Sequence, residues 1–491
     1  MSLIVISLSA QAQILEINAV DEGIIGDGST LNTQKIQAAI DRCSKHPEGG
    51  RLIFSKGIYV TGSLWIKSNV EIHLEKGAVI KGSANPRDYD GFVDVDKNLK
   101  GKHPNLNHPQ LALIRGEKAD KISFTGKGLI DGNGRKLAIQ VDSIQHVTTD
   151  KSPYNHNRPS EFYRPQLFHL SECTNLTILS LQLKNSACWG VTLNKCEHIR
   201  IEHVHLVNRA YWNNDGFDIS DCKHVYLNDC YVNSADDAFC LKSHSRTTFN
   251  DDILIENCTA ISSASAVKFG TASMGGFKNI TIRNMKVKDT FRSAIALESV
   301  DGGILENVLV ENIEAKNTGN AIFVRLGKRA CEKPGIVRNI IIRNLTAEIP
   351  FGTLTPDLAY DMRGPEIGGF YNPFPAPISG IPGHCIENIT LENIKISYPG
   401  RSSNGIAYVP TTGWKKVPEH EGNYPEYSMF SELPSWGFFF RHVRGLHLKN
   451  IQLRTREYDF RPAMFFDDVE DVTKENITIK EAKYKEDRMA R

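Results

Sequence analysis

The sequence predicts an all-β protein folded as a right-handed parallel β-helix, with a short helix capping its N-terminal end. Three observations predict this fold: a motif that recurs along the chain, turn residues between its copies, and one helical segment near the start. The chain has 491 residues, of which 40% are apolar, and a net charge of +1. A chain of this length can form one long solenoid with a continuous core.

The recurring motif is a polar residue followed by alternating apolar and polar residues. Its first copies are separated by 23, 26, 28, 27 and 28 residues and begin at Asn175, His198, His224, Asp252, Asn279 and Asn307. Later copies begin at Asn339, Asn388, Leu446 and Asn476. Alternation with a period of two is typical of strands, and Gly, Asn and Asp in the gaps indicate turns. Several strands per repeat favour a β-helix over a leucine-rich repeat, whose leucine spacing is absent. The recurring asparagines could stack as a ladder of side-chain amides.

The chain divides into a short leader and one domain. Residues 1–12 are apolar and end in small residues, which predicts a signal-peptide remnant and a secreted or periplasmic protein. Residues 13–491 form the β-helix domain, and residues 33–43 have the apolar spacing of a capping helix. Segments near 349–387 and 399–441 are rich in Pro, Gly and aromatic residues. We expect these two segments to be long loop insertions that shape a binding site.

Composition excludes several classes of partner. A net charge of +1 argues against a dedicated nucleic-acid binder, and no apolar run approaches the roughly 20 residues of a membrane helix. The 10 cysteines show no metal-ligand spacing, so we expect buried thiols and neither a metal nor a cofactor. In an oxidising compartment, a disulfide such as Cys188–Cys196 remains an alternative to free thiols.

Two acidic motifs lie one repeat apart and carry the functional prediction. Asn213–Gly216 and Ser234–Asp237 each precede a short strand of the same pattern. If those strands stack, Asp215 and Asp237 lie one coil apart, roughly 4.8 Å along the axis, with Asp236 beside them. Carboxylates crowded in this way raise one another's pKa. Acid/base hydrolysis of a glycosidic bond needs such a group.

The inward-facing residues of successive strands set a register. The predicted inward pairs are Phe217/Ile219, Phe239/Leu241, Val267/Phe269, Ile295/Leu297 and Ile322/Val324. The register places Asp215, Asp237, Ser265 and Ser293 in one column. The residues between the inward pairs are predicted to face solvent: Asp218, Cys240, Lys268, Ala296 and Phe323.

Motifs along residues 18–480 resemble glycoside hydrolase family 28, the polygalacturonase family, whose fold is the pectin lyase-like solenoid. The matching elements, in chain order, are Gly128–Gly134, Asn185–Trp189, Asn213–Asp218 and Ala235–Lys242. The resemblance implies an inverting mechanism with three aspartates. It assigns Asp236 as the general acid, and Asp215 and Asp237 as the groups that activate the attacking water. It also implies a polysaccharide or oligosaccharide substrate.

The chain departs from the family where a galacturonate carboxylate would bind. The family's histidine falls at Ser265, and its Arg-Ile-Lys motif falls on residues 296–298, so that Glu298 stands where a base is expected. Lys268 and Arg325, one coil to either side, are candidates to replace the missing bases. Asn214, Lys268, Glu298 and Arg325 are therefore the predicted substrate-binding residues.

These features predict an exported hydrolase of pectin-like glycans that is not an ordinary polygalacturonase. The long insertions favour exo action, and the missing bases favour a glycan with a neutral sugar beside the bond. Two alternatives stay open: a polysaccharide lyase, which needs a Ca²⁺ site and a basic residue, and a non-catalytic carbohydrate-binding β-helix. The three intact aspartates argue against the second alternative.

Overall fold

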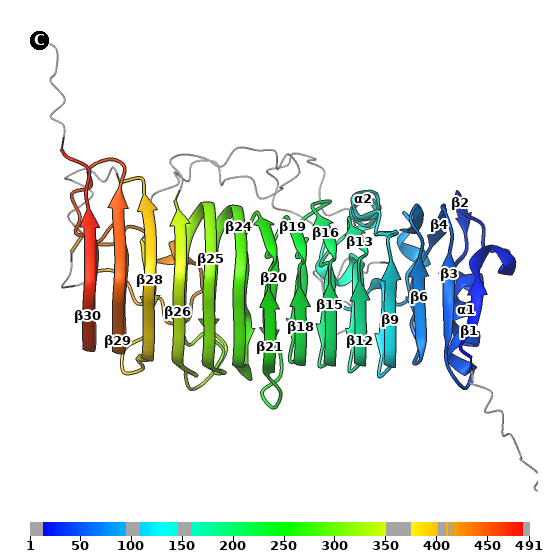
Figure 1. Cartoon of the computed structure of the whole chain (residues 1–491), viewed down its shortest axis with the longest axis horizontal. Helices are drawn as coiled ribbons and strands as arrows, with labels where there is room; N and C mark the ends of the chain where they lie inside the picture. The colour runs from blue at the N-terminus through cyan, green and yellow to red at the C-terminus, as the bar shows by residue number, and fades with distance from the viewer. Residues whose placement is uncertain are drawn as a thin grey trace, which may run out of the picture.

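The chain winds into coils that stack along one axis as a right-handed parallel β-helix, seen here in a computed structural model (Figure 1). The structure describes residues 13–94, 109–145, 159–349, 375–400, 409–410, 413 and 416–484. Strands of successive coils pair in parallel, so equivalent side chains stack on one another along the axis. Among the described residues, no helix combines the length and the apolar character needed to span a membrane.

The strands form three stacks. The first contains β1 (Leu15–Asn18), β3 (Gly50–Phe54), β6 (Val70–Leu74), β9 (Asp120–Gly126), β12 (Thr174–Leu179), β15 (Glu197–Glu202), β18 (Lys223–Asn228) and β21 (Asn250–Glu256). The second contains β2 (Asp27–Leu31), β4 (Gly57–Thr61), β7 (Ala78–Gly82), β10 (Leu129–Asp131), β13 (Gln182–Lys184), β16 (His205–Asn208), β19 (Tyr231–Ser234) and β22 (Thr259–Ser262). The third contains β5 (Leu64–Trp65), β8 (Ala112–Glu117), β11 (Gln166–Ser171), β14 (Val191–Asn194), β17 (Phe217–Ser220), β20 (Phe239–Ser243) and β23 (Val267–Ser273).

In the later coils several strands run on through the corners between stacks. These coils contain β24 (Gly276–Ser299), β25 (Ile304–Leu326), β26 (Ile336–Glu348), β27 (Ala376–Ser379), β28 (Ile386–Tyr398), β29 (Phe438–Thr455) and β30 (Met464–Lys480). The third stack continues through the ends of β24 and β25 to β27, and from there to the start of β29. This stack carries the candidate site.

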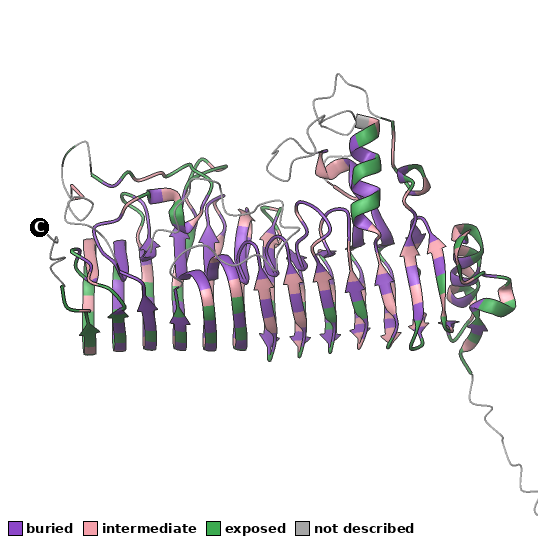
Figure 2. Ribbon diagram, turned by 90° about the horizontal axis from the view of Figure 1, so that it is seen from above, coloured by how far each residue is buried: buried purple, intermediate pink, exposed green. Residues whose placement is uncertain are grey.

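Helix α1 (Thr33–Lys45) forms where the apolar spacing predicts a helix, and lies at the N-terminal end of the coils (Figure 1). It buries Ile36, Ala39, Ile40 and Cys43 in the core, while its role as a cap stays a prediction. Helix α2 (Gly134–Gln145) was not predicted and projects from the coils (Figure 2). The 3₁₀ helices are η1 (Ala19–Glu22), η2 (Pro86–Asp88), η4 (Glu161–Tyr163) and η5 (Tyr427–Phe430).

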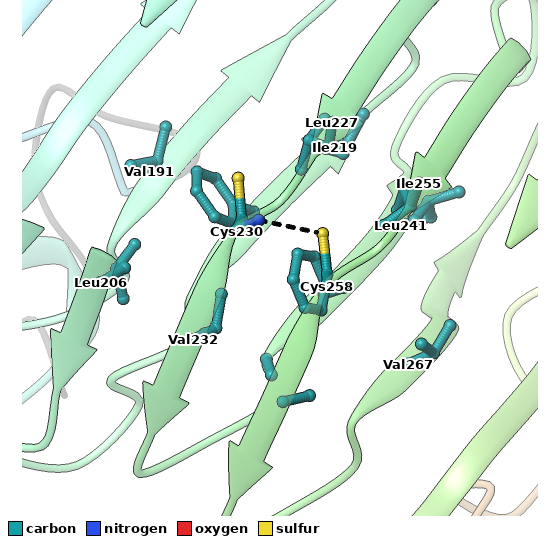
Figure 3. Packing of buried hydrophobic residues seen from close by; sticks show 14 of the residues in the cluster. Val191, Leu206, Ile219, Leu227, Cys230, Val232, Leu241, Ile255, Cys258 and Val267 are labelled. Atoms are coloured by element: carbon teal, nitrogen blue, oxygen red, sulfur yellow. Dashed lines mark hydrogen bonds between the residues drawn. The ribbon is translucent and has the colours of Figure 1, made fainter. Parts of the chain in front are cut away.

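The predicted register of the third stack is confirmed. Phe217 pairs with Phe239, which pairs with Val267, and the column continues through Ile295 to Ile322. All five side chains are fully buried, and they belong to a single core of apolar residues and thiols (Figure 3). Within that core the backbone N–H of Cys230 donates to the Sγ of Cys258 at 3.4 Å.

The predicted exposure of the opposite side of these strands is wrong. The outward residues are buried rather than solvated, namely Asp218, Cys240, Lys268, Ala296 and Phe323. For three of the five the reason is non-local: residues 416–436, which we call the C-terminal loop, cover Ala296 and Phe323 with Val417, Phe430 and other apolar side chains, and place Tyr424 against Lys268. Charged side chains on this face are therefore shielded from water, which strengthens their mutual interactions.

Asparagines at the coil corners form the expected ladder, and a second one beside it. In the predicted ladder, Asn307 Nδ2 donates to Asn279 Oδ1 at 3.1 Å, and Asn339 Nδ2 donates to Asn307 Oδ1 at 3.2 Å. The second ladder joins Asn284, Asn312, Asn344, Asn393, Asn450 and Asn476 through equivalent bonds. The repeat series was wrong for Asn476, which pairs with Asn450 and so belongs to this second ladder and not to the predicted one. These residues have φ near +55°, a conformation that Asn tolerates better than most residues.

Three further expectations have different outcomes. All ten cysteines are free, so Cys188 and Cys196 form no bridge. The predicted insertion near 349–387 contains β27, a strand of the third stack that was missed because its sequence, Ala-Pro-Ile-Ser, lacks the motif. The insertion near 399–441 likewise ends inside β29. The predicted signal-peptide remnant at residues 1–12 lies outside the described residues.

Candidate active site

The three aspartates lie together where the chain enters β17 and β20. The Gly216 N–H donates to the carbonyl of Asp237 at 2.9 Å, so the two acidic motifs stack one coil apart, as predicted. One carboxylate oxygen of Asp215 lies within 4.8 Å of one carboxylate oxygen of Asp237. The Asp237 N–H donates to Asp236 Oδ1 at 3.1 Å, which holds the third carboxylate beside them. All three side chains are buried.

Glycine in the first motif allows this close stacking. A Cβ on Gly216 would overlap the carbonyl oxygen of Ala238 in the next coil. Any side chain there would push the two coils apart at the aspartates. The Asn-Asp-Gly sequence is therefore required by backbone packing as well as by chemistry.

Asn214 has a structural role, which corrects its assignment to substrate binding. Its Oδ1 accepts from the Tyr211 N–H at 2.5 Å, and its Nδ2 donates to the carbonyls of Ser186 and Cys188 at 3.0 and 2.6 Å. The side chain is fully buried. Its amide is thus saturated by the protein and fixes the backbone that precedes Asp215.

Lys242 neutralises one side of the aspartate group. Its Nζ lies 2.5 Å from Asp218 Oδ1 and 3.3 Å from Asp215 Oδ2, and it packs over the Trp189 ring at 4.5 Å. Burial lowers the pKa of Lys242, but the carboxylates of Asp218 and Asp215 outweigh that effect and hold it well above its usual value. Lys242 is therefore a permanent cation within the site.

Asp215 has the chemical character of a base. Burial raises its pKa well above the usual value and Asp218 adds to the rise, while Lys242 opposes it. Its Oδ1 is buried and has no hydrogen-bond partner among the described residues. An ionised Asp215 would therefore accept a proton readily.

Lys268 joins the other side of the aspartate group, and its assignment to substrate binding stays a prediction. Its Nζ lies 3.7 Å from Asp237 Oδ2 and 3.3 Å from the Tyr424 hydroxyl. Asp237 also accepts the Ser265 N–H at 3.0 Å through Oδ1. Burial lowers the pKa of Lys268, but Asp237 and Glu298 outweigh burial and hold it well above its usual value.

Glu298 is buried beside Lys268, with 1% of its surface exposed. Burial raises the pKa of Glu298 to about 8, against the attraction of Lys268. Its Oε2 has no hydrogen-bond partner within the described part of the chain. A Cβ on Gly270, one coil earlier, would lie 3.3 Å from this oxygen. Glycine at 270 thus leaves space next to the carboxyl group.

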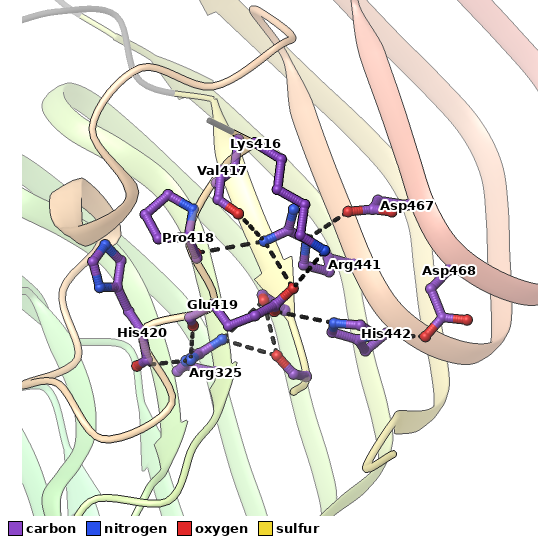
Figure 4. A network of polar contacts seen from close by, with 12 residues as sticks. Arg325, Lys416, Val417, Pro418, Glu419, His420, Arg441, His442, Asp467 and Asp468 are labelled. Atoms are coloured by element: carbon purple, nitrogen blue, oxygen red, sulfur yellow. Dashed lines mark hydrogen bonds and ion pairs between the residues drawn. The ribbon is translucent and has the colours of Figure 1, made fainter. Parts of the chain in front are cut away.

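Arg325 holds the C-terminal loop in place, which corrects its assignment to substrate binding. Its Nη1 donates to Ser379 Oγ and the Gly380 carbonyl, both at 2.9 Å, and its Nη2 to the carbonyls of Glu419 and His420 at 2.7 and 3.1 Å (Figure 4). Burial lowers its pKa to about 10. Both terminal nitrogens are engaged by the protein, so Arg325 is unsuited to receive a substrate carboxylate.

Further contacts fix the C-terminal loop next to the aspartates and were missed by sequence reasoning. Arg292 Nη1 lies 2.9 Å from Glu426 Oε2, and the Tyr427 hydroxyl donates to the carbonyl of Phe291 at 3.5 Å. Burial lowers the pKa of Arg292, but Glu426 above all outweighs it, and Asp236 and Asp237 add to the rise, which places this cation in the electrostatic field of the site. Arg292 occupies the position of Asp236 two coils later, a signal that the register contained.

The described residues bring one potential metal-ligating group together: Asp215, Asp237 and Cys240. Burial raises the pKa of the Cys240 thiol well above its usual value, and sulfur is a poor ligand for a hard cation such as Ca²⁺. Ca²⁺, which a lyase would need, requires six to eight oxygen ligands. Lys242 and Lys268 already supply positive charge to the two carboxylates, so this group does not fit a Ca²⁺ site.

Comparison with known proteins shows the family. The sequence model of glycosyl hydrolases family 28 matches residues 76–353, more than half of the chain. The chain belongs to this family. It is therefore a glycoside hydrolase, as the motif order predicted, and the recognition of the family is confirmed.

Individual relatives are distant but extensive in coverage. A protein named probable polygalacturonase from Vitis vinifera is 26% identical, over 80% of this chain and 72% of its own. The exo-poly-alpha-D-galacturonosidase of Dickeya chrysanthemi is 24% identical, over 77% of this chain and 71% of its own. The family 28 exopolygalacturonase of Yersinia enterocolitica superposes with a TM-score of 0.63 at 16% identity, covering 95% of this chain and 78% of its own, which confirms the fold.

Proposed function

We propose that this protein is an inverting hydrolase of pectin-like polysaccharides or oligosaccharides. The observation that carries the proposal is the trio of buried carboxylates, Asp215, Asp236 and Asp237, stacked in two motifs between Lys242 and Lys268. Asp236 is the general acid that protonates the glycosidic oxygen. Asp215 and Asp237 bind and activate the water that attacks the anomeric carbon from the opposite face.

The two lysines keep this division of roles workable. Lys242 lies close to Asp215 and Asp218 and favours the ionised form of these two carboxyl groups. Lys268 lies next to Asp237. Three unscreened carboxylates at this separation would otherwise share protons and blur the assignment of acid and base. The charge arrangement supports hydrolysis by acid/base catalysis without a bound metal.

We propose exo action, because the C-terminal loop covers the outer face of the third stack on one side of the aspartates. Its apolar residues pack on Ala296, Phe323 and Phe439, and Arg325 and Arg441 bind its backbone carbonyls. A polymer that cannot extend past the loop presents a chain end to the acid. The exo-acting relative from Dickeya chrysanthemi supports the same proposal. Export is proposed as well, since a polymeric pectic substrate lies outside the cell.

Incubation with a panel of pectic polysaccharides and oligosaccharides tests the proposal. We expect saturated products released from one chain end, with the anomeric configuration of the first-formed sugar inverted when the reaction is followed by NMR. Unsaturated products that absorb in the ultraviolet would indicate a lyase. A first product of retained configuration would mean a covalent intermediate and would overturn the roles given to Asp215 and Asp237. Binding without turnover would indicate a non-catalytic module.

A further inference from the structure

In the part of the chain that the structure describes, the three cations of the aspartate group are already paired with protein carboxylates. Lys242 is shared by Asp215 and Asp218, Lys268 lies next to Asp237, and Arg292 pairs with Glu426. The side chains at the site include six carboxyl groups and three cations, namely Asp215, Asp218, Asp236, Asp237, Glu298 and Glu426 with Lys242, Lys268 and Arg292. Even with Asp236 protonated as the general acid and Glu298 neutral, four carboxyl groups face three cations, so none of these cations is left over for a sugar carboxylate.

The region around Glu298 offers hydrogen bonding instead of charge. Glu298 has a buried carboxyl oxygen without a partner among the described residues, and Gly270 leaves space next to it. With a pKa raised to about 8, the side chain carries a proton over most of the neutral range and can both donate and accept. A sugar hydroxyl has the same two capacities, so the two groups are complementary.

Tyr424 adds an aromatic surface at the same place. Its ring lies 5.1 Å from Lys268 Nζ and its hydroxyl accepts from that ammonium group, yet the side chain is 53% exposed. An aromatic ring held beside a catalytic centre and open to solvent can pack against the C–H face of a sugar. The ring belongs to the C-terminal loop, which is fixed by Arg292 and Arg325.

We propose that Glu298, Lys268 and Tyr424 form a subsite that takes a neutral sugar, not a uronate, next to the bond that is cleaved. The inference rests on the proposed function and adds the substrate class. Glu298 hydrogen-bonds a ring hydroxyl, Lys268 stays with Asp237, and Tyr424 packs against the ring. The enzyme thus acts on pectic glycans in which a neutral sugar flanks the bond.

A matched pair of substrates tests the inference. Galacturonan oligosaccharides and their carboxyl-reduced counterparts have the same linkage and differ only in charge, and rhamnogalacturonan oligosaccharides add alternating neutral and acidic sugars. We expect kcat/KM to be about tenfold higher when a neutral sugar flanks the bond, which corresponds to about 1.4 kcal/mol for one unfavourable charge contact. Equal or greater kcat/KM on the unmodified galacturonan would overturn the neutral subsite and leave the hydrolase in place. No hydrolysis of any of the three would overturn the proposed function, and the subsite with it.

Variants make the test specific to Glu298. Glu298→Gln keeps shape and hydrogen bonding, so the preference for the neutral sugar should remain within a few-fold. Glu298→Lys should shift the ratio of acidic to neutral kcat/KM upward by about tenfold or more. Glu314→Lys, at an exposed position of β25, is the matched charge reversal and should leave the ratio unchanged. If Glu298→Lys does not fold, the wild-type comparison and Glu298→Gln still decide. Loss of the preference in Glu298→Gln would overturn the role of its hydrogen bond.

Discussion

Two lysines in adjacent coils of the third stack, Lys242 with 14% of its side chain exposed and Lys268 with 1%, have contrasting surroundings. Lys242 in β20 has both carboxylate partners within the preceding coil, Asp215 and Asp218, and contacts them at 3.3 and 2.5 Å. Lys268 in β23 has a longer contact to Asp237, at 3.7 Å, and a hydroxyl partner, Tyr424, that is 156 residues away in the chain. The first environment is encoded in two short motifs, whereas the second depends on the C-terminal loop.

Under the proposed function, the difference separates the part of the site assigned to the chemistry from the part assigned to substrate selection. The Lys242 side consists of motif residues that a hydrolytic mechanism requires together. The Lys268 side combines the departures from the family, Glu298 above all, with side chains supplied by the loop. Substitutions on the two sides should therefore affect different measurements.

The largest effect is expected at Asp236, whose carboxylate acts electrostatically on Asp215 and on Arg292, that is, on both sides. Asp236→Asn should lower kcat by about 10²–10⁴-fold, because the amide keeps the shape but delivers no proton. Steady-state kinetics measures this, and circular dichroism checks the fold. Asp229→Asn, at an exposed position of an adjacent corner, is the control and should keep kcat. Retention of more than about a tenth of kcat in Asp236→Asn would exclude it as the general acid.

On the Lys242 side of the site, Lys242→Met should lower the free energy of unfolding. It leaves Asp215 and Asp218 buried without their cation, and removing one partner of a buried ion pair costs about 3–5 kcal/mol. The loss should grow as pH rises, because both carboxyl groups have raised pKa values and ionise without compensation. Urea unfolding at several pH values measures it. Lys184→Met, which breaks a pair at a lysine with 40% of its side chain exposed, should cost less than about 1 kcal/mol.

Glu298→Gln should remove the part of the pH dependence of unfolding that comes from the buried Glu298 carboxyl group. The folded pKa of about 8 lies above the usual 4.5, so the group favours the folded state below pH 4.5 and loses that contribution as pH rises towards 8. Over this range the unfolding free energy of the wild type should fall by roughly 3–5 kcal/mol relative to the variant. The pKa of Glu298 is lowered by Lys268 and Arg292 and raised by Glu426 and Asp237. The wild type and the variant both contain these four neighbours. A constant difference across this pH range would contradict the raised pKa.

Lys268→Met should have the smallest effect on folding, about 1–3 kcal/mol, because its contact with Asp237 is longer and Glu298 is largely neutral at pH 7. Comparison of this value with that of Lys242→Met tests the contrast between the two sides directly. A cost equal to or larger than that of Lys242→Met would remove the contrast.

The inner face of the coils could be predicted from the sequence because one local rule fixes it. Alternation in each strand places Phe217 and Phe239 inside, and parallel pairing then sets the register of every later coil. Asp215 and Asp237 follow from that register. The roles of Asn214 and Arg325 could not be predicted, because they depend on partners such as Cys188 and Glu419, which no spacing rule connects to them. Export also stays a prediction.

The asparagine ladders have a consequence for how such a molecule can change. The bond from Asn388 to Asn339 spans 49 residues, and that from Asn450 to Asn393 spans 57, whereas neighbouring bonds elsewhere span 26 to 32. The corner geometry is the same in each case. The asparagine bonds therefore form regardless of how many residues separate the two asparagines in the chain. Loops on the far side can therefore lengthen, shorten or be exchanged while the coils stay aligned, and a new specificity can evolve without a new scaffold.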